Sequence, residues 1–126
     1  MKRIILDTNF LLIPTQFKVD IFSEIDRICL FNYKLYIVDK TIDELKKIIE
    51  KQKEKHKLAA KIALAFIKKK KIAKIKTKEG HVDDLILDLL NKDTILATQD
   101  ALLRKNAIKS GFSVIFLRSN KYLLLK

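Results

Sequence analysis

Short apolar runs and segments of helical periodicity alternate along the whole chain. The runs are rich in Ile, Leu and Val, and they predict short strands at 3–6, 35–38, 72–75, 94–97 and 113–117. Apolar residues spaced as on one face of a helix predict helices at 19–31, 41–50, 55–69, 82–91 and 100–110. Strands that alternate with helices form crossover units, so the sequence predicts a three-layer α/β/α fold with a central, mostly parallel sheet. The tail RSNKYLLLK is compatible with a last short strand or with a segment packed on the sheet edge.

The chain length fits one domain that spans residues 1–126. Two Gly and one Pro leave no flexible linker that would divide it. No apolar run approaches the ~20 residues of a membrane span, and the start MKRIILD lacks the apolar core and cleavage site of a signal peptide. The single cysteine, Cys29, excludes a disulfide framework. We therefore expect a soluble, cytoplasmic protein with no membrane association.

The positive charge is concentrated in one segment. Residues 40–78 hold fifteen lysines and four acids, a balance of +11 in a chain whose total is +12. A lysine run such as 68–71 is ordinarily a solvated helix end, and lysines also accumulate in thermophilic proteins. A basic segment on a nearly neutral body is more typical of a surface that binds nucleic acid. Because the segment holds few aromatics, we expect contacts to phosphate and not to bases.

Four acidic residues stand where predicted strands end or predicted helices begin. They are Asp7 after the first strand, Glu44 and Asp83 in the first turns of two helices, and Asp100 after the strand at 94–97. In open α/β sheets, ligands bind outside the carboxyl ends of the strands. The sequence therefore makes these acids candidates for one site.

Three of these acids also have a structural explanation. Thr41 and Glu44 have the spacing of a helix capping box. Asp100 suits a helix N-cap, and Asp83 complements the positive end of a helix dipole. Asp7 differs, because the residues that follow it read as a loop with no helix to cap. Burying such a carboxylate without a partner is costly, so Asp7 needs a further explanation.

Two of the acids belong to acidic pairs whose members helical geometry separates. At about 100° per residue, Asp83 lies at the flank of the apolar stripe of its helix, whereas Asp84 lies nearly opposite the stripe. Glu44 lies at the flank of its own stripe, and Asp43 lies farther round. Each pair therefore offers one carboxylate to the interior and one to solvent.

Converging carboxylates imply a divalent cation. Each carboxylate raises the pKa of the next, and a cation relieves this repulsion. An all-oxygen set without His or Cys favours Mg²⁺ or Mn²⁺ over Zn²⁺. His56 and His81 stand far apart in the sequence, and a pair of metal ligands is the weaker interpretation of them.

Five motifs occur in the order and spacing of the PIN-domain family and together span nearly the whole chain. They are ILDTNFLLIP, IDEL, VDDLIL, ILATQDALLR and VIFLRSNKYL. The chain most resembles the archaeal and eukaryotic PIN proteins of ribosomal RNA processing, of the small-subunit processome type, and next the VapC-type toxin nucleases. The resemblance implies a metal-dependent endoribonuclease that hydrolyses RNA phosphodiester bonds in ribosomal RNA processing.

The resemblance also implies roles for individual residues. Asp7, Glu44, Asp83 and Asp100 would be the catalytic acids around one or two Mg²⁺ or Mn²⁺ ions, with Asp84 as the alternate if the alignment slides by one. Asn9 and Thr98 would orient a carboxylate or a water. The RNA backbone would lie on the basic segment, against Lys46, Lys47, Lys51, Lys53, Lys57, Lys68, Lys69, Lys70 and Lys71.

One position departs from the family pattern and keeps alternatives open. Many members carry another acid two residues after the residue that matches Asp100, whereas this chain has Leu102 there. The missing acid leaves the binding of a second metal ion open. It also favours, as an alternative function, a catalytically weak RNA-binding scaffold in ribosome assembly, whereas the four retained acids argue against that alternative. A VapC-type toxin ribonuclease with an antitoxin partner shares the same chemistry. A homodimer is expected by analogy with the family.

Overall fold

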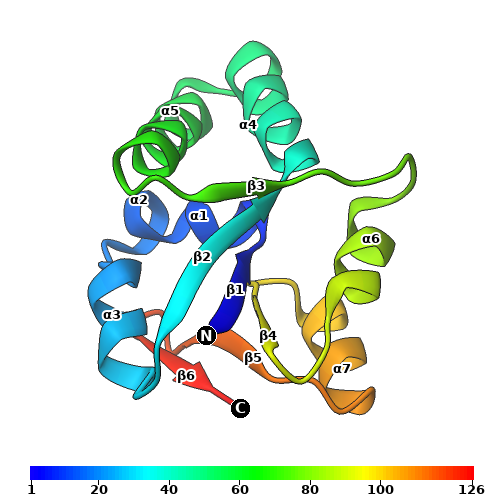
Figure 1. Cartoon of the computed structure of the whole chain (residues 1–126). Helices are drawn as coiled ribbons and strands as arrows, with labels where there is room; N and C mark the ends of the chain where they lie inside the picture. The colour runs from blue at the N-terminus through cyan, green and yellow to red at the C-terminus, as the bar shows by residue number, and fades with distance from the viewer.

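A six-stranded sheet forms the centre of the molecule. The computed structural model describes all 126 residues. The strands are β1 (Lys2–Leu6), β2 (Tyr33–Val38), β3 (Ala73–Ile75), β4 (Thr94–Ala97), β5 (Val114–Arg118) and β6 (Tyr122–Leu125). Their order is β3-β2-β1-β4-β5-β6, with β1 to β5 parallel and β6 antiparallel to β5 (Figure 1). The tail is thus a strand, which decides between the two alternatives that the sequence left open.

Seven helices connect the strands. They are α1 (Thr8–Leu11), α2 (Ile13–Phe17), α3 (Ile21–Ile28), α4 (Asp39–Lys51), α5 (Glu54–Lys69), α6 (Val82–Leu89) and α7 (Ala101–Lys109). No helix combines the length and the hydropathy that a membrane crossing requires. The five predicted helices and five predicted strands are all present, with ends that differ by a few residues.

Alternating side chains of the strands build a core on each face of the sheet. Ile4 and Leu6 of β1 pack in a cluster with α1 to α5, whereas Ile5 packs in a second cluster with α6 and α7. All three side chains are fully buried. Their alternation between the two clusters follows from the two-residue period of a strand. Figure 1 shows α6 and α7 on one side of the sheet and the other helices on the opposite side. The predicted three-layer α/β/α fold is confirmed.

Two short helices occupy the segment that the sequence predicts as a loop after Asp7, so that prediction is wrong. α1 and α2 have four and five residues, which is too short for an apolar stripe to repeat along a helix. Pro14 lies in the first turn of α2, where its missing N–H removes no helical hydrogen bond.

The start of α4 also differs from the prediction. The helix begins at Asp39, two residues before the predicted start, and Val38 is its N-cap. Thr41 therefore lies inside the helix and is fully buried. The predicted capping box of Thr41 and Glu44 is wrong, and Glu44 needs another explanation.

Candidate active site

A cleft of about 250 Å³ opens beside the carboxyl ends of β1 and β4. These two strands are neighbours in the sheet, and the strand order changes direction between them, which is where open α/β sheets bind ligands. The cleft is lined by Asp7, Thr8, Asn9, Leu12, Glu44, Ile48, Val82, Asp83 and Asp100. All four acids singled out from the sequence thus line one cleft, although they come from four different parts of the chain.

Asp7 is the buried member of this set. Its residue is 6% exposed. Oδ1 accepts a hydrogen bond from the Thr8 amide at 2.9 Å, and Oδ2 accepts one from the Thr98 hydroxyl at 2.7 Å. Asp7 is also the N-cap of α1, so it does have a helix to cap. It forms no ion pair with any Lys or Arg side chain, which leaves the carboxylate charge without a cationic partner.

Burial changes the acidity of Asp7. It raises the pKa of the carboxyl from 3.8 to about 6, against the hydrogen bonds from Thr98 and Thr8, which lower it. The nearby carboxylates of Asp83 and Glu44 raise the pKa of Asp7 further. The Asp7 site therefore favours a proton or another cation, because hydrogen bonds alone do not offset the desolvation of a carboxylate here.

Thr98 and Asn9 fix the loop after β4. The Thr98 hydroxyl accepts from the Asp100 amide at 3.0 Å, so its one proton is directed to Asp7 at 2.7 Å and not to Asn9 at 3.4 Å. Asn9 Oδ1 accepts from the Gln99 amide at 2.9 Å. Thr98 therefore contacts a carboxylate of the cleft directly, whereas Asn9 supports the backbone beside it.

Glu44 is held by a residue that the sequence did not single out for it. The Thr8 hydroxyl donates to Glu44 Oε1 at 2.8 Å, and the buried Thr41 hydroxyl lies 3.4 Å from that of Thr8. This contact joins residues 36 positions apart, so no local sequence pattern signals it. It follows only once the start of α1 and the middle of α4 are known to face each other.

Asp100 and Asp83 lie at the starts of α7 and α6. Asp100 is the N-cap of α7, as predicted, and its Oδ1 accepts from the Leu102 and Leu103 amides at 2.9 and 3.0 Å. Asp83 is exposed, yet the partial desolvation of its carboxyl raises its pKa, and the carboxylates of Asp100 and Asp84 raise it further. Asp84 is exposed and does not line the cleft, so the structure turns Asp83 of this pair toward the other acids.

The segment that leads to Asp83 is anchored to the start of α4. Asp39 accepts from the Thr77 amide at 3.2 Å and from the Thr77 hydroxyl at 2.5 Å. Lys40 Nζ in turn donates to Thr77 Oγ1 at 2.7 Å and to the Lys78 carbonyl at 2.6 Å. We call these contacts of Asp39, Lys40, Thr77 and Lys78 the β3–α6 clip. The clip ties the connection between β3 and α6 to the element that carries Glu44.

The donor set of the cleft suits a hard cation. The four carboxylates share the cleft, yet no three His, Cys, Asp or Glu side chains lie close enough together to hold a metal ion by themselves. Mg²⁺ commonly takes only one or two protein carboxylates and completes its shell with water and substrate oxygens. A buried carboxylate without an ion pair, opposite further carboxylates, fits such an ion.

Comparison with known proteins shows the family of the chain. The family model described as a PIN like domain matches residues 4–120. The chain belongs to the PIN-like domain family. The Ribonuclease VapC4 of Methanocaldococcus jannaschii is 30% identical and aligns over 97% of this chain and 95% of its own length.

Two solved structures share the fold of this PIN-like domain. The PIN domain endonuclease Utp24 superimposes with a TM-score of 0.77 at 21% identity, over 98% of this chain and 90% of that chain. A domain of a functionally unknown protein from Methanocaldococcus jannaschii superimposes with a TM-score of 0.60 at 18% identity, over 94% and 93% of the two chains. At these identities the likeness is one of fold.

The nine lysines singled out from the sequence lie on α4, on α5 and in the turns at their ends. Eight are exposed, and Lys57 is half-buried beside Glu54, with Nζ 3.7 Å from Oε1. None of the nine lines the acidic cleft of the PIN-like domain. The positive surface therefore flanks the acids instead of neutralising them. Leu102, which stands where many PIN proteins carry a further acid, is 67% exposed at the start of α7.

Proposed function

We propose that this PIN-like domain is a metal-dependent endoribonuclease. The observation that carries the proposal is the Asp7 carboxylate, buried without a cationic side chain in a cleft that three further acids line. Buried charges in proteins are paired or coordinate metals, and an all-carboxylate set suits Mg²⁺ or Mn²⁺. Asp7, Glu44, Asp83 and Asp100 would hold the ion or the waters around it.

The residues of the chain would prepare the cleft for a phosphodiester. The Thr98 and Thr8 hydrogen bonds fix the Asp7 carboxylate, and the Thr8 hydroxyl fixes Glu44. Asp100 uses Oδ1 to cap α7, so its other oxygen is the one available to the cleft. A bound divalent ion lowers the pKa of water and stabilises negative charge on phosphoryl oxygens. The four acids supply the negative charge that retains such an ion.

RNA is the substrate class that the comparisons support. The relative named Ribonuclease VapC4 aligns over nearly its whole length, and the lysines of α4 and α5 give a surface for a phosphate backbone. The DTNF start and the TQDALLR ending favour a ribosomal RNA precursor as the target. The 30% identity to VapC4 keeps a toxin ribonuclease with an antitoxin partner as the second candidate.

Hydrolysis of structured and single-stranded RNA in Mn²⁺ tests the proposal. The Asp7→Asn variant should cleave at least about 100-fold more slowly than the wild type, since loss of a cation ligand removes several kcal/mol of transition-state stabilisation. The matched control is Asp84→Asn, an exposed acid outside the cleft, which should cleave at the wild-type rate. Equal cleavage by the wild type and Asp7→Asn would overturn the proposal. A wild type that binds RNA but shows neither Mn²⁺ binding nor cleavage would favour the scaffold alternative.

A further inference from the structure

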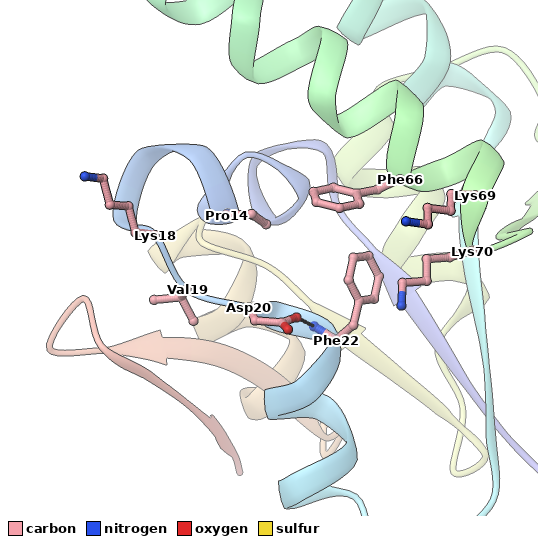
Figure 2. Close-up of a pocket in the computed structure, with 8 residues that line it drawn as sticks. All are labelled: Pro14, Lys18, Val19, Asp20, Phe22, Phe66, Lys69 and Lys70. Atoms are coloured by element: carbon pink, nitrogen blue, oxygen red, sulfur yellow. Dashed lines mark hydrogen bonds between the residues drawn. The ribbon is translucent and has the colours of Figure 1, made fainter.

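A second cleft, of about 330 Å³, combines two aromatic rings with three lysines on the side of the molecule formed by α2, α3 and α5 (Figure 2). It shares no lining residue with the acidic cleft. Leu12 lines the acidic cleft and Pro14 lines the second one. The two clefts therefore lie on either side of the junction between α1 and α2.

The aromatic rings belong to Phe22 of α3 and Phe66 of α5. Their centroids are 5.3 Å apart and their planes meet at 65°, an edge-to-face pair. Both residues are only half-buried, and both rings border the cleft (Figure 2). Aromatic side chains that line a basic cleft are the elements on which proteins stack the bases of single-stranded nucleic acid.

Two of the three lysines, Lys69 and Lys70, stand beside the ring pair, whereas Lys18 lies farther along the cleft, beyond Pro14. Figure 2 shows Lys18 on one side of the rings and Lys69 and Lys70 on the other. All three are exposed and none forms an ion pair. Lys70 Nζ lies 4.9 Å from the centroid of the Phe22 ring, so this lysine joins the charged part of the cleft to its aromatic part.

The one acid of the cleft, Asp20, already accepts hydrogen bonds within its own helix. Asp20 caps α3 by accepting from the Phe22 and Ser23 amides at 3.1 and 3.2 Å, and its other oxygen accepts from the Ser23 hydroxyl at 2.7 Å. Three lysines against one engaged carboxylate leave the cleft positive. Its chemistry therefore matches a ligand that carries both an aromatic ring and negative charge.

We propose that this cleft binds one nucleotide of a single-stranded RNA at a distance from the cleavage site. In a single strand each base is flanked by phosphates, and here a ring pair stands beside Lys69 and Lys70, with Lys18 farther along the same cleft. The inference rests on the proposed function, because a strand that is cleaved in the acidic cleft extends beyond it, and Leu12 and Pro14, two positions apart in the chain, line the two clefts. The basic segment alone predicts contacts to phosphate, whereas Phe22 lies outside that segment and the fold brings it to Phe66.

Fluorescence anisotropy of a fluorescein-labelled oligoadenylate in EDTA tests the inference, with inorganic polyphosphate as a probe that has charge but no base. The Phe66→Leu variant should bind oligoadenylate about 5- to 10-fold more weakly than the wild type and polyphosphate equally well, because only the base stacks. The Lys69→Ala/Lys70→Ala variant should weaken binding of both probes. The matched control is Lys55→Ala/Lys61→Ala, which removes two exposed lysines of the same helix that do not line the cleft and should weaken binding of both probes less than Lys69→Ala/Lys70→Ala does.

Unchanged oligoadenylate binding by Phe66→Leu, or equal losses in the two double-lysine variants, would overturn the inference. Thermal unfolding followed by circular dichroism verifies that each variant folds, and Phe22→Leu takes the place of Phe66→Leu if the latter does not. EDTA makes the measurement independent of cleavage. If the wild type hydrolyses RNA but Phe66→Leu does not change oligoadenylate binding, only the distant nucleotide site is overturned. If Phe66→Leu weakens oligoadenylate binding but the wild type does not hydrolyse RNA in Mn²⁺, only the endonuclease proposal is overturned.

Discussion

At the scale of single residues, Asp7 is held by two hydrogen bonds that orient its charge without neutralising it. The Thr8 amide and the Thr98 hydroxyl each serve one carboxylate oxygen, yet burial raises the pKa of the group to about 6. Hydrogen bonds thus set the geometry, and the remaining electrostatic cost is left for a cation to offset. This division of roles predicts a pH-dependent effect of removing the charge.

Asp7→Asn should stabilise the metal-free protein at neutral pH and not in acid. Because the folded-state pKa of Asp7, about 6, lies above the ordinary aspartate pKa of 3.8, the stabilisation from protonated Asp7 is present below pH ~3.8 and is lost as the pH rises through about 6. Relative to the wild type, the variant should gain roughly 1–3 kcal/mol of unfolding free energy near pH 7.5, and the gain should shrink toward zero near pH 4. Urea unfolding in EDTA at both pH values measures it.

The exposed acid Asp84 supplies the control for this prediction, since Asp84→Asn removes a charge at the surface. A gain that is the same at both pH values, or that Asp84→Asn reproduces, would contradict the burial argument. Adding Mn²⁺ should stabilise the wild type and not Asp7→Asn, because a ligand stabilises only the folded state that binds it.

For single residues, the sequence predicts the direction of a side chain better than its long-range contacts. It places Asp7 at the end of a strand and turns Asp83, not Asp84, toward the interior, because strand and helix periods fix side-chain direction locally. In the structure Asp7 directly follows β1, and Asp83 lines the cleft whereas Asp84 does not, although both residues of the pair are exposed. The hydrogen bond from Thr8 to Glu44 crosses 36 positions, and no local period contains that information.

At the scale of elements, the β3–α6 clip holds the segment before α6 against the first turn of α4. The connection from β3 to α6 would otherwise be an exposed loop, and residues 78–81 are indeed exposed. Asp39 and Lys40 bind Thr77 and Lys78 from the first turn of α4. The hydrogen bond from the Thr77 hydroxyl lowers the pKa of Asp39 most, and the bond from the Thr77 amide lowers it further. The Asp39 carboxylate therefore stays ionised and accepts these bonds. Asp83 therefore depends for its position on residues that do not line the cleft.

Thr77→Val should loosen α6 without disturbing the far side of the sheet. The variant removes the hydrogen bonds of the Thr77 hydroxyl to Asp39 and Lys40, which costs about 1–2 kcal/mol, whereas the bonds of the Thr77 amide and the Lys78 carbonyl remain. Hydrogen exchange should speed up in the amides of α6 and stay unchanged in those of α3, and RNA hydrolysis in Mn²⁺ should slow. Thr15→Val is the matched control, since Thr15 makes no side-chain hydrogen bond. Faster exchange throughout the protein would mean that the clip serves overall stability and not the position of α6.

Element boundaries were predictable where apolar periodicity extends over several turns. The helix predicted at 55–69 and the observed α5 differ by one residue at the start. α1 and α2 were missed because one helical turn contains no repeat to detect. α4 starts two residues early, at Asp39, whose carboxylate accepts from Thr77 across 38 positions. Tertiary contacts, not local propensity, therefore set the boundaries that the sequence did not reveal.

At the scale of the whole molecule, charge of opposite sign is separated between the acidic cleft and the helices beside it. The acids converge because the carboxyl ends of parallel strands meet at one edge of the sheet, which the alternation of strands and helices already predicts. The lysines of residues 40–78 lie on α4, on α5 and in the segments that follow them. Phe22 and Phe66 meet only in the folded chain, so the second cleft was beyond any prediction from composition.

This separation of charge predicts that RNA affinity depends steeply on salt and that α4 contributes to the dependence. Lys46 and Lys47 are exposed on the helix that carries Glu44. Each phosphate contact on a single strand contributes about 0.7 to the slope of log affinity against log salt concentration. Lys46→Ala/Lys47→Ala should therefore lower that slope by up to about 1.4 in anisotropy titrations in EDTA. Lys105→Ala/Lys109→Ala, with two exposed lysines of α7, should leave it unchanged. Equal reductions in both variants would mean that RNA responds to the net charge of the protein and not to a surface on α4 and α5.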